Sequence, residues 1–171
     1  MKRGIHLNRK NDIINQFHQL PSWMNSIKGM DEQLWGSPLS DGKWSTSEVL
    51  AHILNWDQYL LAEILPSVRN RKEMNFPDFD PFNQLASAYA KSGISSEALL
   101  NEAIAVREQL INQLIEMPDE LLTYPLPVNG VSHCPHTGRP YSLIFIIEDF
   151  IEHDNHHKQE IVRFLHVNNI N

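Results

Sequence analysis

Apolar residues recur every three or four positions along four long stretches of this chain, and this spacing predicts four amphipathic helices. Segments rich in proline and glycine separate the stretches, and no segment alternates apolar and polar residues convincingly enough to predict a sheet. The sequence therefore predicts an all-α fold. Four such helices bury their apolar faces most economically in an up-down bundle. The predicted helices span residues 9–28, 45–65, 95–117 and 142–166.

The second predicted helix has the clearest start, and a long connection follows it. Ser45 and Glu48 match a capping box, in which each side chain bonds the backbone amide of the other residue. Pro66 is expected to disturb the end of this helix, because proline lacks an amide hydrogen. Two prolines interrupt residues 70–82, and a short helix is predicted over residues 81–91. We therefore expect a long crossover between the second and third helices of the bundle.

Composition narrows the class of protein. The 171 residues suit one domain over residues 1–171, long enough to enclose a hydrophobic core. A net charge of −7 argues against nucleic-acid binding, which requires clustered lysine and arginine. No apolar run approaches the roughly 20 residues of a membrane span, and no apolar segment follows the basic N-terminus as in a signal peptide. The single cysteine, Cys134, fits a reducing compartment, so we expect a cytoplasmic protein without a membrane partner.

Nine histidines are the unusual feature of the composition, and three of them lie close together in the fourth predicted helix. Residues four apart share a helix face, so His153 and His157 can offer their imidazoles to one metal ion. At about 100° per residue, these two lie beside the apolar arc, whereas His156 lies among polar positions. The sequence therefore predicts that His153 and His157 point inward and that His156 points outward.

The third candidate ligand is His52, in the second predicted helix. It lies at the edge of the core face, where a side chain can line a cleft between helices. Three neutral imidazoles would leave coordination positions open for water or substrate. Histidine pairs four residues apart are common without a metal, and a histidine at a core edge is usually only hydrogen-bonded. The hypothesis of a metal site rests on both helices together.

Other side chains are candidates for the surroundings of this site. Asp154 lies at the centre of the apolar arc, so it needs a partner. It can accept a hydrogen bond from a ligand imidazole or anchor a donor from the first or third helix. Trp56, Tyr59 and Glu63 lie on or near the edge that carries His52 and are pocket candidates, and for the two aromatic residues an ordinary core position is the alternative.

The segment His133-Cys134-Pro135-His136 allows two further interpretations, a second metal site or a nucleophilic cysteine. Its three potential ligands can touch one ion, but the second half of a zinc-finger spacing is absent. We prefer a loop that is merely rich in histidine. An intermediate possibility is a loop that covers the metal cleft and adds His133 or His136 to the substrate pocket.

The order of several motifs resembles the DinB-like superfamily. Residues 44–52, with the sequence WSTSEVLAH, resemble the tryptophan, helix cap and histidine that open the second helix of that family. Residues 153–161, with the sequence HDNHHKQEI, resemble its closing H-D-x-x-H-x-x-E/Q-I motif. Residues 76–83 resemble the crossover of one subgroup, and residues 95–114, with Arg107, resemble the helix that follows. The similarity spans residues 16–165, but residues 128–141 match nothing in it.

The resemblance implies a four-helix bundle, often dimeric, with a divalent metal held by three histidines. Carried over to this chain, those histidines are His52, His153 and His157. Characterised relatives include bacillithiol S-transferases and mycothiol-dependent maleylpyruvate isomerase, in which low-molecular-weight thiols are cosubstrates. In such a protein the metal would lower the pKa of a bound thiol or water and so supply a nucleophile.

Together with this resemblance, the candidate metal ligands predict a metal-dependent thiol S-transferase that acts on small electrophiles. Its expected partners are the electrophile, a low-molecular-weight thiol and a second copy of the chain in a homodimer. Zinc or nickel is the expected metal, although imidazole also suits copper and iron. One alternative is a hydrolase that uses metal-bound water, and another is a non-catalytic stress or binding protein. An open coordination position facing a pocket would favour an enzyme, whereas a fourth protein ligand would favour a structural role.

Overall fold

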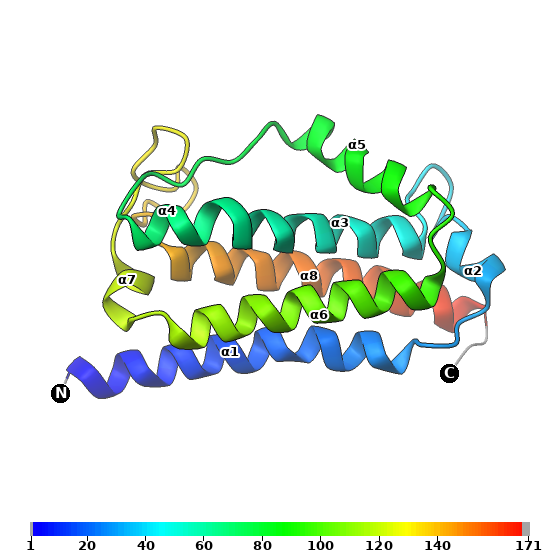
Figure 1. The fold of residues 1–171 in the computed structure, drawn as a ribbon, viewed down its shortest axis with the longest axis horizontal. Coiled ribbons are helices and arrows are strands. Elements are labelled where there is room, and N and C mark those ends of the chain that lie inside the picture. Colours follow the sequence, from blue (N-terminus) through cyan, green and yellow to red (C-terminus); the bar gives the residue numbers. More distant parts are fainter. Residues whose placement is uncertain (1, 169–171) are drawn as a thin grey trace.

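A computed structural model describes residues 2–168, and its four long helices confirm the all-α prediction (Figure 1). Over these residues the chain forms isolated β-bridges but no strand. None of the helices within this range is both long and hydrophobic enough to cross a bilayer. The long helices are α1 (Lys2–Ser26), α3 (Thr46–Tyr59), α6 (Ser96–Glu116) and α8 (Leu143–Val167). The shorter ones are α2 (Glu32–Gly36), α4 (Leu65–Arg69), α5 (Phe79–Ala90) and α7 (Asp119–Thr123).

The chain crosses over between α3 and α6, as predicted. Because of this crossover, α3 and α6 run in the same direction, opposite to α1 and α8 (Figure 1). The crossover contains α5, which packs against α3. Residues 70–78 and α5 therefore form a strap along the second helix of the bundle, and this strap supplies part of the pocket described below.

The second helix is irregular next to Pro66, where a disturbance was expected, but it continues past this residue. A π-helical turn, η1 (Leu60–Ile64), connects α3 to α4, so the helical path continues to Arg69. In this turn the amide of Leu65 bonds to the carbonyl of Leu60, five residues earlier. The hydrogen-bond ladder is thus already shifted where Pro66, which has no amide hydrogen, enters the helix.

Among the residues whose burial the structure describes, the hydrophobic core consists of two clusters that follow one another along the bundle axis. One surrounds Phe17, Ile64 and Leu110, and the other surrounds Met24, Leu50 and Leu100. Between them lies a layer of three buried charged residues, one from each of three helices: Asp57 of α3, Arg107 of α6 and Asp154 of α8.

The predicted capping box is present and also fastens the strap. The Ser45 hydroxyl accepts from the amide of Glu48 (3.3 Å), and Glu48 Oε2 accepts from the amide of Ser45 (3.1 Å). The other carboxylate oxygen of Glu48 accepts from Ser87 Oγ (2.6 Å) and pairs with Lys91 Nζ (2.7 Å). One side chain therefore caps α3 and holds the C-terminal end of α5.

Acid is expected to weaken this attachment. Burial alone would raise the pKa of Glu48, but hydrogen bonds from Lys91, Ser87 and Ser45 lower it from 4.5 to about 2. A carboxyl whose folded pKa lies below its unfolded value adds stability that is present above the unfolded pKa. We expect Glu48→Gln to remove part of the stability that the native protein loses between pH 4.5 and 2. Urea unfolding of both proteins across that range measures the difference; an equal pH dependence would contradict the prediction.

Candidate metal centre

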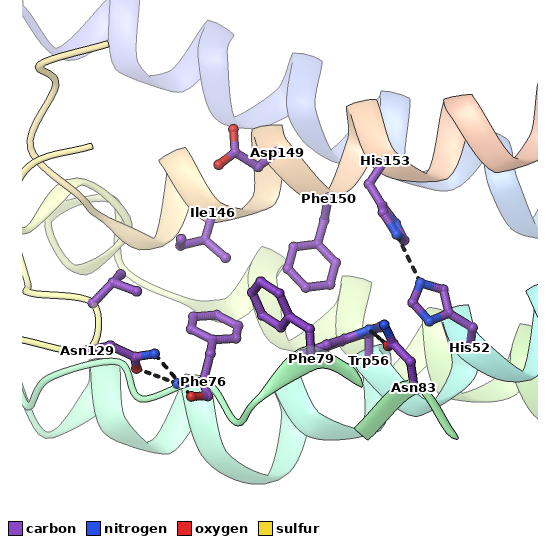
Figure 2. Close-up of a pocket in the computed structure, with 11 residues that line it drawn as sticks. His52, Trp56, Phe76, Phe79, Asn83, Asn129, Ile146, Asp149, Phe150 and His153 are labelled. Atoms are coloured by element: carbon purple, nitrogen blue, oxygen red, sulfur yellow. Dashed lines mark hydrogen bonds between the residues drawn. The ribbon is translucent and has the colours of Figure 1, made fainter. Parts of the chain in front are cut away.

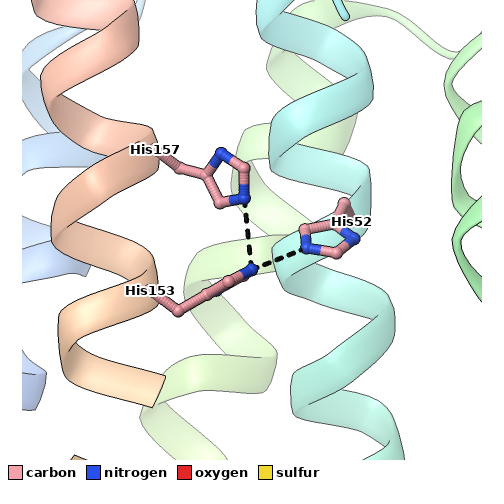
Figure 3. Close-up of side chains that lie close together, drawn as sticks. All are labelled: His52, His153 and His157. Carbon is pink, nitrogen blue, oxygen red and sulfur yellow. Dashed lines mark hydrogen bonds between the residues drawn. The ribbon is translucent and has the colours of Figure 1, made fainter. Parts of the chain in front are cut away.

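Three histidines from two helices converge at one point between α3 and α8 (Figure 3). Nε2 of His153 lies 2.9 Å from Nε2 of His52 and 3.1 Å from Nε2 of His157. One nitrogen from each ring lies within 4.8 Å of the other two. No further histidine, cysteine or carboxylate joins this group among the residues that the structure describes.

Hydrogen bonds among the three rings cannot satisfy all three of these nitrogens at once. A neutral imidazole nitrogen carries either one hydrogen or one lone pair. Nε2 of His153 has two nitrogen neighbours and so can form a good hydrogen bond with only one of them. A divalent cation between the three nitrogens would engage all three lone pairs, and two ligands of a tetrahedral ion with bonds of ~2.1 Å lie about 3.4 Å apart. The observed spacings of 2.9 and 3.1 Å fit such an ion after a small outward movement of the rings.

Carboxylates face the opposite nitrogens of two of these rings. Nδ1 of His153 lies 3.4 Å from Asp154 Oδ1, and Nδ1 of His157 lies 3.2 Å from Glu160 Oε2. A carboxylate at Nδ1 favours the tautomer that carries its hydrogen there. The Nε2 lone pairs are then directed towards the centre of the group, as metal binding requires.

Asp154 also belongs to the buried charged layer, so both roles foreseen for it are combined. Its other oxygen accepts from Arg107 Nη1 (2.8 Å). Arg107 donates in a bidentate manner to Asp57, from Nε (2.6 Å) and Nη2 (2.9 Å). Burial alone would lower the pKa of Arg107, but Asp154 and Asp57 raise it above its ordinary value. The layer thus carries one positive and two negative groups, and its net negative charge suits a cation at the adjacent histidines.

The electrostatics of the cluster keep two of the rings neutral. Burial lowers the pKa of His52 to about 3, and the neighbouring His153 and His157 act in the same direction. Burial also lowers the pKa of His157. Neutral imidazole is the form that binds a metal. His156, by contrast, has a side chain that is 66% exposed and does not belong to the group.

A pocket of about 350 Å³ opens beside His52 and His153 (Figure 2). Its walls come from α3, α8, the strap and the loop before α8, and most of them are aromatic or aliphatic. The lining residues are His52, Trp56, Phe76, Phe79, Asn83, Val128, Asn129, Ile146, Asp149, Phe150 and His153.

Of the predicted pocket residues, Trp56 lines this pocket and the other four do not. Tyr59 packs its ring against Trp56 and donates its hydroxyl to the carbonyl of Asn75 (2.7 Å), so it supports the wall from behind. Glu63 is exposed, because it lies in the π-helical turn, where the extra residue changes the angular position of each side chain. His133 and His136 are exposed on their loop, which contributes Val128 and Asn129 instead.

The sequence interpretation missed two groups of residues. Asp57 and Arg107 could have been found, because each is a charged residue at a core-facing position of its helix. The aromatic side chains of the strap, Phe76 and Phe79, gave no comparable signal, since they lie in or next to a segment without helical or strand periodicity. The pocket could therefore not have been assembled from sequence spacing.

The fold and the site define a helical bundle with an open three-histidine centre. A family model of the DinB superfamily matches residues 18–161, so the chain belongs to that superfamily, as the motifs indicated. The solved structure of YfiT from Bacillus subtilis is similar, with a TM-score of 0.69 and 14% sequence identity, over 95% of this chain and 89% of that one. YfiT is described as a probable metal-dependent hydrolase with an unusual four-helix bundle topology, and at this identity the likeness shows the fold. None of the curated proteins matches the chain.

Proposed function

We propose that this protein is a metal-dependent enzyme acting on small electrophiles, with zinc or nickel at His52, His153 and His157. The observation that carries the proposal is an open group of three histidines at one end of an apolar pocket. When bound, the metal supplies Lewis acidity that lowers the pKa of a coordinating thiol or water. The pocket holds the electrophile and keeps bulk water away from it.

The nucleophile that fits best is an exogenous thiol, which makes the reaction an S-transfer. Among the described lining residues, Asp149 is the sole carboxylate, and it points away from the aromatic rings (Figure 2). Free water has a much higher pKa than a free thiol, so water depends more strongly on the metal and on a general base in the pocket. A thiol with a free pKa of ~8.5 needs only a modest shift to ionise near neutral pH.

The second candidate is a hydrolase, in which water replaces the thiol. The similarity to YfiT, which is described as a probable metal-dependent hydrolase, supports it. In both reactions this chain's residues have the same tasks. Asp154 and Glu160 orient His153 and His157, and the pocket positions the electrophile.

Product formation in the presence and absence of thiol distinguishes the two candidates. We expect zinc-loaded protein to convert a chlorinated arene only when a low-molecular-weight thiol is present, and chelated protein to be inactive. The rate should follow ionisation of a group with a pKa below the ~8.5 of a free thiol. Turnover without thiol would replace the transferase proposal by the hydrolase. Inactivity with every thiol and electrophile of a broad panel would favour a non-catalytic binding protein.

A further inference from the structure

The pocket beside the histidines is elongated along α8. His153 lines it near one end and Ile146 lines it towards the other (Figure 2). Seven residues of α-helix correspond to about 10 Å. Aromatic rings form the wall between the two ends: the Trp56 ring lies 5.7 Å from the Phe79 ring and 6.1 Å from the Phe150 ring, measured between centroids. The pocket therefore offers an apolar surface along its length, which suits an elongated apolar group.

The end of the pocket away from the histidines is formed in part by a tight turn at residues 128–131 (Figure 2). Val128 and Val131 exchange two backbone hydrogen bonds, of 2.8 and 2.9 Å. Between them, Asn129 and Gly130 have φ angles of 47° and 80°, as in the type I′ turns that Asn-Gly sequences favour. Because both sides of the turn are hydrogen-bonded, this end of the pocket has a defined shape.

Further hydrogen bonds join this turn to the strap. Asn129 Oδ1 accepts from the backbone amide of Phe76 (2.7 Å), and Asn129 Nδ2 donates to the carbonyl of Phe76 (3.1 Å). The backbone amide of Asn129 donates to the carbonyl of Met74 (3.2 Å). The strap and the turn thus close the pocket at this end, whereas Phe79, which is 62% exposed, marks its open side.

We infer that the electrophile carries an elongated apolar group that lies along α8 with its reactive end at the histidines, and that Ile146 and the turn at residues 128–131 limit the length of this group to about eight carbon atoms. Carbon–carbon bonds of about 1.5 Å at near-tetrahedral angles advance an extended chain by about 1.25 Å each, so about eight of them fill about 10 Å. Carbons beyond this length would emerge at the open side and gain little from burial. This inference rests on the proposed function, because it names the class of electrophile for that same site.

Straight-chain carboxylates from butanoate to dodecanoate test the length limit on zinc-loaded protein, since carboxylate oxygen is an accepted zinc ligand. Calorimetry measures their affinities below the concentrations at which they form micelles. We expect the affinity to rise about threefold with each methylene up to octanoate and to stop rising beyond it. A rise that continues to dodecanoate would overturn the inference.

The length limit and the metal proposal can fail separately. The 1-alkanols from butanol to dodecanol should show the same limit on zinc-free protein whose helicity is verified by circular dichroism. Zinc titration of the same protein decides the metal proposal. Absence of binding by both the carboxylates and the alkanols would overturn the inference even if zinc binds.

Ile146→Val and Ile146→Ala shorten this side chain by one and two carbon–carbon bonds. The longest chain that still gains affinity should therefore grow by about one and about two carbon atoms. Ile144→Ala is the matched control, because both isoleucines are 6% exposed on α8 and Ile144 lies outside the pocket lining, so the limit should stay at octanoate. An unchanged limit in both Ile146 variants, or equal shifts in Ile146→Ala and Ile144→Ala, would overturn the role of Ile146. Ile146→Val is the milder change and keeps the test decisive if Ile146→Ala does not fold.

Discussion

Replacing Arg107 by methionine is expected to destabilise the protein by about 3–5 kcal/mol. The guanidinium is fully buried and contacts Asp57 and Asp154, whose side chains are 1% and 6% exposed. Methionine preserves much of the volume but leaves both carboxylates buried without a counter-charge, which is the costly way to break a buried ion pair. Urea unfolding followed by circular dichroism, on metal-free protein, measures the loss.

Arg163→Met is the matched control, because Arg163 is exposed on α8, and it should change stability by less than about 0.5 kcal/mol. Adding Asp57→Asn to Arg107→Met removes one of the two stranded charges and should restore part of the stability. If Arg107→Met costs no more than Arg163→Met, the buried layer does not have the role we assign to it.

Replacing His153 by alanine should lower zinc affinity by about 100-fold or more, since even residues that only orient a ligand contribute 10–100-fold. His153 is the ring whose Nε2 lies near both other histidines. The helical content should persist, because the two apolar clusters supply most of the stability. Calorimetric zinc titration and circular dichroism of the same samples measure both quantities.

His156→Ala is the control for this variant, because it removes an imidazole from the same helix but from its exposed side. Its zinc affinity should stay within a few-fold of the native value. Equal losses in the two variants would mean that the ligands are wrongly assigned. Global unfolding of His153→Ala would indicate a structural metal instead.

Local sequence rules were sufficient for the long helices and for the side of its helix on which each of these histidines lies. The Ser45–Glu48 capping box marks the beginning of α3, and helical periodicity placed His52, His153 and His157 beside the core and His156 outside it. These features depend on residues within a few turns of one another, so a sequence read along a single helix contains the information.

Features that depend on contacts between distant segments were not predictable in this way. The π-helical turn η1 carries the helix past Pro66, and the short α7 lies in a stretch that was not expected to be helical. The pocket combines Phe150 of α8 with Phe76, which lies 74 positions earlier in the chain. No periodicity links two such residues, because the crossover brings them together only in the folded bundle.

The charged layer between the two apolar clusters has a consequence for how the helices can slide. Apolar side chains pack almost as well after a shift of one turn, about 5.4 Å along the axis, so an apolar interface alone tolerates such a slip. The bidentate contact of Arg107 with Asp57 does not, since a slip would strand buried charges. The layer therefore fixes the axial position of α3, α6 and α8 relative to one another. His153 is the neighbour of Asp154 in the sequence, so the layer also fixes the height of α8 at which His153 lies. The apolar clusters on either side can therefore change during evolution while His153 and His157 of α8 stay opposite His52 of α3.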